Sequence, residues 1–135
     1  MRKLDQRGMA AFEFCLVAVP LFTLMFVIFD LGRYAITVQS LRSLANAGAR
    51  TWMINDCYVN NVMTKSSPTC SGDPLPSAAA KNAVAPMLGG LSPTLNTTTG
   101  ASALTITAAL PSFKMLMPIW GSALNAPSAS TTIPF

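Results

Sequence analysis

The feature that most constrains this chain is a long apolar run near its N-terminus. Residues 9–29 contain a single charged residue, Glu13. As an α-helix, these 21 residues extend for about 31 Å, close to the thickness of the hydrocarbon core of a bilayer. A small domain within a chain of 135 residues offers too little partner surface to cover such a helix. The run therefore predicts a transmembrane helix, with a buried core helix as the alternative.

The residues on either side of the run predict its orientation and its fate. Three basic residues precede it, and two follow it: Arg2, Lys3 and Arg7, then Arg33 and Arg42. This bias favours a cytoplasmic N-terminus, a single pass through the cytoplasmic (inner) membrane and a C-terminal domain outside the cytoplasm. A cleavable signal peptide has a shorter apolar core, of about 7–15 residues, and small residues at its cleavage site. We therefore expect this helix to stay in the mature protein.

The composition argues against most enzyme classes. The chain has no histidine, only 10% of its residues are charged, and its five acidic residues are scattered singly. The commonest general base, the usual zinc ligand and a paired-carboxylate site are therefore not available. Half of the net charge of +4 comes from the first eight residues, and no basic patch with interleaved aromatics follows. We expect no catalytic activity, no metal or other cofactor, no small-molecule substrate and no nucleic-acid partner.

The order of features around the apolar run narrows the choice further. A short basic leader ends at Gly8, Met9 begins the run, and Glu13 is the fifth residue counted from Met9. Beyond the run come residues 29–33, FDLGR, and residues 45–50, ANAGAR. Together these elements resemble the TadE-like minor pilins and pseudopilins of the tight-adherence (Flp-type) pilus, which is a type IV-like system.

The resemblance, which is firm over about residues 7–52, implies a route of maturation and assembly. A prepilin peptidase would cut between Gly8 and Met9 on the cytoplasmic side and remove residues 1–8 as a leader. Glu13 would then pair with the terminal amine of a neighbouring subunit, since a carboxylate in a low dielectric is tolerable when paired and costly when alone. The implied partners are the peptidase, other pilin or pseudopilin subunits, and membrane lipid.

The helix is expected to continue outside the membrane as an amphipathic extension over residues 30–54. Its apolar residues recur at spacings of three and four, at Leu31, Ala35, Val38, Leu41, Ala45, Ala49 and Trp52. This stripe predicts packing against the chain's own globular part, with a seam against other pilus subunits as the alternative. Asp30 stands where the family often has glutamate, and Arg33 and Arg50 match the family but are equally explained as solvated charges. Within the membrane, Pro20 predicts a kink.

The remainder, residues 55–135, is rich in Ser, Thr, Pro, Gly and Asn and predicts a small extracytoplasmic α+β domain. Cys57 and Cys70 have twelve residues between them, and in an exported domain this spacing favours a disulfide. Closing such a loop contributes about 3 kcal/mol. Two unpaired thiols are the alternative, whereas Cys15, in the apolar run, is interpreted as a small apolar residue.

Local patterns predict a helix and three strands in this domain. The helix covers residues 77–88, with Ser77 as its N-cap. Alternation of apolar and polar residues over 103–110 indicates a half-buried strand, residues 113–117 suggest a second, and residues 128–133 a third. The predicted fold class is therefore α+β. A long N-terminal helix, transmembrane and kinked, extends outside the membrane and carries a small antiparallel sheet of about three strands.

Residues 113–120 leave three interpretations open. Large apolar side chains surround a single lysine, Lys114. The default interpretation is that they belong to the core. One alternative is an interfacial anchor at the membrane surface, where Trp and Lys are favoured, and the other is a surface for a partner subunit.

We therefore expect a minor pilin or pseudopilin, a structural or assembly component of a tight-adherence pilus used in surface attachment and biofilm formation. The alternative is an unprocessed, permanently anchored single-pass membrane protein that serves as a scaffold or binding module. Retention of residues 1–8 in the mature chain would favour that alternative.

Overall fold

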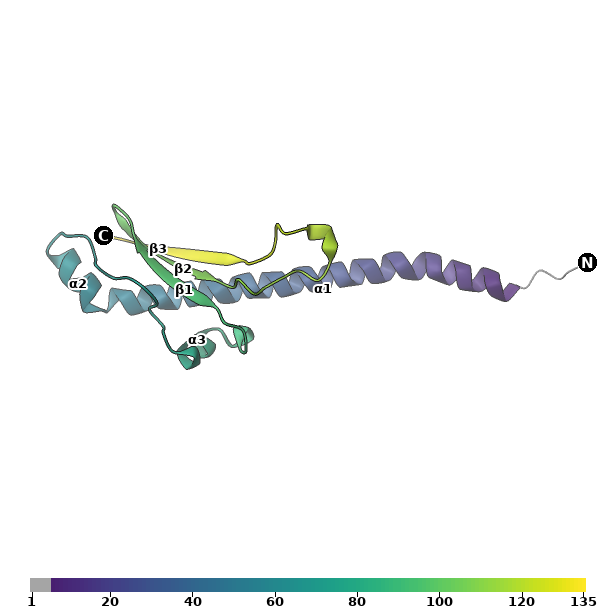
Figure 1. Ribbon diagram of the computed structural model, residues 1–135, viewed down its shortest axis with the longest axis horizontal. Helices are drawn as coiled ribbons and strands as arrows, with labels where there is room; N and C mark the ends of the chain where they lie inside the picture. The colour runs from purple at the N-terminus through teal and green to yellow at the C-terminus, as the bar shows by residue number, and fades with distance from the viewer. Residues whose placement is uncertain (1–5) are drawn as a thin grey trace, which may run out of the picture.

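The computed structural model describes residues 6–135, with side chains from Gly8 onward. Most of the predicted leader, including Arg2 and Lys3, lies outside the described residues. In chain order the elements are α1 (Gln6–Met53), α2 (Asp56–Met63), α3 (Ala78–Val84), η1 (Pro86–Leu88), β1 (Thr94–Thr99), β2 (Ala103–Ala109), η2 (Pro118–Trp120) and β3 (Ser128–Pro134). Figure 1 shows α1 as a long rod with every later element gathered along its C-terminal half. We call residues 30–135 the body.

The N-terminal half of α1 stands clear of the rest of the chain. None of residues 9–29 is buried, and only two of them are even partly covered. The helix runs through Pro20 without interruption. The hydroxyl of Thr23 donates to the carbonyl of Val19 at 2.8 Å, so this polar group is satisfied inside the helix. The alternative of a buried core helix is therefore wrong, and α1 is long and apolar enough to cross a membrane.

The C-terminal half of α1 forms one wall of the core. Four of its core hydrophobic residues are at most 2% exposed: Leu41, Leu44, Ala45 and Ala49. Here the predicted stripe packs against the chain's own sheet. Nearer the N-terminus of α1 the prediction is wrong, because Leu31 and Ala35 are exposed. In this part of α1 the buried face is shifted by one residue relative to the predicted stripe, so that Asp30 and Thr37 are covered, at 1% and 7% exposed.

The sheet supplies the other wall of the core. Its order is β1-β2-β3, with both neighbouring pairs antiparallel. The central strand β2 directs three fully buried residues inward: Leu104, Ile106 and Ala108. In register with them, Leu95 of β1 lies opposite Ala108, and Ile133 of β3 lies opposite Leu104. The alternation of β2 along the sequence therefore matches its burial, as expected for a sheet with one covered face.

Two of the three strands match the sequence patterns, and one does not. β2 and β3 fall at the predicted positions. The strand suggested at residues 113–117 is absent, and β1, at residues 94–99, takes its place in the sheet. The backbone amides of Leu116 and Met117 donate to Asp30 of α1 instead of to a strand partner. The apolar alternation at 113–117 thus reflects docking on a helix.

The short helices begin where the sequence places capping residues. The side chain of Ser77 accepts from the amide of Ala80, as an N-cap does. The predicted helix over 77–88 is divided, because α3 ends at Val84 and η1 begins at Pro86, a position where proline cannot continue the hydrogen-bond pattern. Asn55 caps α2 in the same way as Ser77 caps α3.

At Gly48, α1 packs tightly against β1, β2 and the segment before α3. A Cβ atom at this position would lie 2.8 Å from Pro74, 3.1 Å from Leu95 and 3.2 Å from Ile106. We expect Gly48→Val to lower the free energy of unfolding by about 1–3 kcal/mol, because overpacking a tight core forces its neighbours to move. Thermal unfolding of the purified chain in detergent would measure this.

Gly32, on the same helix, provides a matched control for that substitution. A Cβ atom at Gly32 would meet nothing within 4 Å. Gly32→Val should therefore leave stability unchanged or raise it slightly, since valine is the better helix former. Equal losses at the two glycines would show that packing against the sheet is not the cause.

Candidate functional sites along the N-terminal helix

The residues predicted for processing and assembly lie on the bare half of α1. Gly8 has open space around it, Met9 is 63% exposed, and Glu13 is also exposed. Because they are four residues apart, Met9 and Glu13 share one face of the helix, a single turn from each other. Glu13 makes no hydrogen bond or ion pair with any side chain that the structure describes. Its carboxylate is therefore accessible to a group on another molecule.

A second carboxylate, Asp30, lies at the point where the bare half of α1 meets the body. Although it is a charged residue, Asp30 is only 1% exposed. Its Oδ2 accepts from the backbone amides of Leu116 and Met117, at 2.9 and 3.0 Å. Its Oδ1 accepts from Arg33 at 3.3 Å. These bonds to a charged acceptor hold residues 113–120, which we call the docking loop, against α1.

Two aromatic rings extend the contact made by Asp30. The guanidinium of Arg33 lies 5.4 Å from the centroid of the Phe113 ring, within cation–π range. The rings of Tyr34 and Phe113 are 6.2 Å apart and tilted by 57°, a favoured aromatic geometry. Phe113 is 7% exposed. Within the docking loop, Phe113 is therefore the only residue that is buried, as the core interpretation predicts.

The Asp30 contact was not predicted from the sequence, although a signal for it exists. Asp30 is the first charged residue after the apolar run, and Arg33 follows three residues later on the same helical face. An acid at that spacing from an arginine, directly after a membrane-length run, indicates an ion pair at the end of the run. The partner amides come from residues more than eighty positions later, and no local pattern locates them.

The two cysteines of the body form a disulfide. Cys57, in α2, is joined to Cys70, with Cα atoms 5.3 Å apart. Cys70 is 2% exposed and belongs to the core cluster. The disulfide therefore ties α2 and the following loop to the sheet. Two further bonds act alongside it, because Tyr58 donates to the carbonyl of Pro134 and Trp52 donates to Thr97, both at 2.8 Å.

Removing this disulfide should destabilise the body without unfolding α1. For Cys57→Ser combined with Cys70→Ser, we expect a loss of about 3 kcal/mol in the free energy of unfolding, from loop-closure entropy restored to the unfolded chain. Thermal unfolding with and without reductant would measure this loss. The double variant should be indifferent to reductant, and an equal response in both proteins would contradict the assignment.

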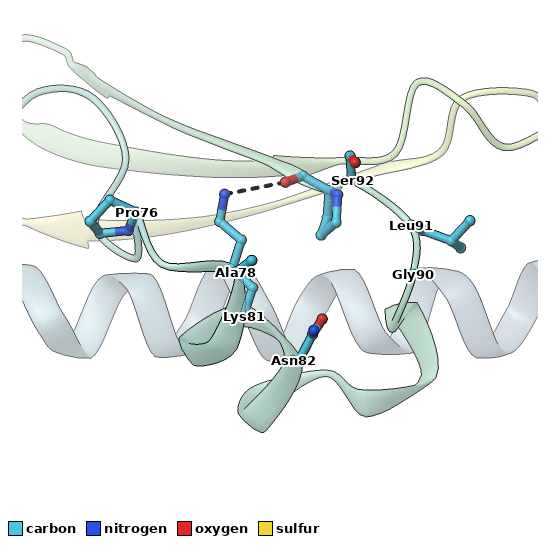
Figure 2. Close-up of a pocket in the computed structure, with 8 residues that line it drawn as sticks. Pro76, Ala78, Lys81, Asn82, Gly90, Leu91 and Ser92 are labelled. Atoms are coloured by element: carbon cyan, nitrogen blue, oxygen red, sulfur yellow. Dashed lines mark hydrogen bonds between the residues drawn. The ribbon is translucent and has the colours of Figure 1, made fainter.

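A shallow cavity of about 320 Å³ lies between α3 and the loop that precedes β1. Figure 2 shows Lys81 reaching across it toward a backbone carbonyl. Its Nζ donates to the carbonyl of Pro93 at 3.3 Å and lies 2.6 Å from a carboxylate oxygen of Asp73. A lysine nucleophile needs a free, unprotonated amine. Lys81 instead pairs with Asp73, in the segment before α3, and its bond to Pro93 ties α3 to the loop that precedes β1.

Comparison with known proteins gives a match on α1. The family model for TadE-like proteins matches residues 8–50. No curated protein and no solved structure matches the chain. The matched segment includes Gly8, Glu13, Asp30 and Arg33 and ends before the disulfide and the sheet. Over residues 8–50, about a third of the chain, this protein is therefore similar to the TadE-like protein family.

Proposed function

We propose that this protein is a minor pilin or pseudopilin, a structural and assembly component of a tight-adherence pilus that mediates surface attachment. The observation that carries the proposal is the bare half of α1. Residues 9–29 expose apolar side chains on every face, interrupted by one carboxylate, Glu13. A helix that is apolar all round needs lipid or other helices around it. A prepilin-like subunit uses both in turn, first in the membrane and then in the filament.

The body fits an extracytoplasmic location. Structural disulfides persist in oxidising compartments and are rare in the cytosol, and Cys57–Cys70 is part of the core. With α1 as a single pass through the cytoplasmic membrane, the body lies outside the cytoplasm and the leader lies inside. The membrane-facing residues 9–29 then continue directly into the body, because α1 is unbroken as far as Met53.

Processing creates the charge that Glu13 pairs with. Cleavage by a prepilin peptidase between Gly8 and Met9 leaves an ammonium group on Met9. In a bundle of these helices, the amine of one subunit and Glu13 of its neighbour neutralise each other in a medium where either charge alone is costly. The pair therefore favours one register between neighbouring subunits. Glu13 acts here as an assembly residue, and the protein is the substrate of the peptidase.

The test is the N-terminus of the mature chain. Intact mass and N-terminal sequencing of the protein, isolated from cells with and without the prepilin peptidase, are the measurements. We expect a chain that begins at Met9 in the presence of the peptidase and at Met1 in its absence. A chain that begins at Met1 in both would overturn the proposal and leave an unprocessed membrane anchor.

A further inference from the structure

The docking loop presents large apolar side chains to the outside. Leu116 is 75% exposed and Ile119 is 60% exposed. The loop does not belong to the sheet, and η2 is its one regular turn. Its backbone is nevertheless held in place by the two amide bonds to Asp30. An apolar pair on a firmly anchored loop indicates a contact surface.

The position of the loop on α1 identifies what it meets. Asp30, to which the loop is bound, follows directly after the bare apolar residues 9–29. Figure 1 shows the loop around η2, in yellow-green, as the part of the body that reaches furthest toward the N-terminus of α1. When residues 9–29 span a bilayer, the loop lies at the level where the hydrocarbon ends. Leu116 and Ile119 are then beside the lipid surface.

The chemistry of the loop favours lipid over a protein partner. Trp120 is partly exposed, and its indole nitrogen is buried without a hydrogen-bond partner among the described residues. Lys114 is exposed on the same loop, and the half-exposed Arg33 of α1 lies over the ring of Phe113 of that loop. Trp with Lys or Arg, next to aliphatic side chains, is the composition found where proteins meet the headgroup region. Phosphate and ester oxygens there accept hydrogen bonds from the exposed N–H groups of Lys114 and Arg33.

We propose that the docking loop is a second membrane contact, in which Leu116 and Ile119 insert into the outer surface of the bilayer that α1 crosses. The proposal rests on the membrane placement of α1 in the proposed function. With two attachments, α1 and the loop, the body is held against the membrane at a fixed tilt. Extraction of the subunit into a filament must break the second contact.

Two tryptophans make the contact measurable, because the chain has only Trp52 and Trp120. The full chain is reconstituted in phosphatidylcholine–phosphatidylglycerol vesicles that contain lipids with a nitroxide near the headgroup end of the acyl chain. In Trp52→Phe, emission comes from Trp120 alone, and we expect most of it to be lost. In Trp120→Phe, emission comes from Trp52, which is packed near Thr97 at the far end of the body, and we expect it to persist.

Further variants link the quenching to the apolar pair and guard against misfolding. Leu116→Ser combined with Ile119→Ser, in the Trp52→Phe chain, should restore most of the Trp120 emission. If Trp52→Phe disturbs the fold, the difference between the parent chain and Trp120→Phe gives the Trp120 signal directly. Equal quenching of Trp52 and Trp120 would overturn the proposal, because it would show general adsorption of the body.

A probe on Cys15 separates failure of this proposal from failure of the membrane placement. Cys15 is the free cysteine among the described residues and is exposed on the bare half of α1, so a thiol-reactive fluorophore labels it alone. If the Cys15 label is quenched by lipid nitroxides and Trp120 is not, α1 is in the membrane and the loop proposal is wrong. Such a loop would then be available to a neighbouring subunit. If neither is quenched, the membrane placement itself is wrong, and this proposal falls with it.

Discussion

Asp30→Ala should release the docking loop from α1 and lower the free energy of unfolding of the body by about 3–5 kcal/mol. The variant removes the acceptor for the amides of Leu116 and Met117, and a hydrogen bond to a charged group contributes about 1.5–3 kcal/mol. The ion pair with Arg33 adds little, because the Arg33 side chain is 48% exposed. We therefore expect most of the loss to come from the loop.

Amide hydrogen exchange, measured on the full chain in detergent, resolves this prediction along the chain. In Asp30→Ala, residues 113–120 should exchange fast, while the amides of β2 remain the slowest in the body. Asp56→Ala is the matched control, since Asp56 is exposed in α2 and makes no contact with the loop. Unchanged exchange at Leu116 and Met117 in Asp30→Ala would contradict the role given to Asp30.

Glu13→Ala should leave the protein in the membrane and exclude it from pili. Loss of the carboxylate removes the partner of the neighbouring amine, and an unpaired buried charge costs about 3–5 kcal/mol, so we expect incorporation to fall by at least about tenfold. Membrane insertion should not suffer, because alanine is cheaper than glutamate in lipid. Membrane fractionation and the subunit content of sheared pili are the two measurements.

The control for Glu13→Ala is Glu13→Asp, which keeps the charge on a shorter side chain. We expect it to retain a substantial part of the incorporation, whereas Glu13→Gln should behave like the alanine variant. Normal pili with Glu13→Ala would refute the pairing model. Loss of the protein from the membrane in that variant would instead point to an insertion defect.

Much of the fold could be predicted from periodicity in the sequence. Residues 9–29 are apolar apart from Glu13 and Thr23 and are not buried against the body, and the alternation over 103–109 matches the burial of β2. Both features depend on local spacing, which a sequence displays directly. Ser77 as the N-cap of α3 is predictable for the same reason, because a cap acts on amides two or three residues away.

The errors at β1 and at residues 113–117 share a physical cause, which is that the decisive partner lies far along the chain. β1 has a single large apolar residue facing the core, Leu95. Its other inward residue, Thr97, is also buried, and its hydroxyl accepts a hydrogen bond from Trp52 of α1. A threonine-rich hexamer therefore lacks the apolar alternation that would predict a strand with one face in the core. The same applies to residues 113–117, whose apolar alternation resembles a strand although their amides are taken by Asp30.

The unbroken course of α1 has a geometric consequence for any assembly in which Glu13 selects the neighbour. Each residue of an α-helix rotates the chain by about 100° around the axis. α1 continues as one helix from Glu13, through Pro20, to the residues that pack against the sheet. The direction in which the Glu13 side chain leaves the helix axis is therefore coupled to the orientation of the sheet around the same helix. When Glu13 selects a neighbouring subunit within the hydrocarbon, that pairing then also determines which surface of the body faces outward.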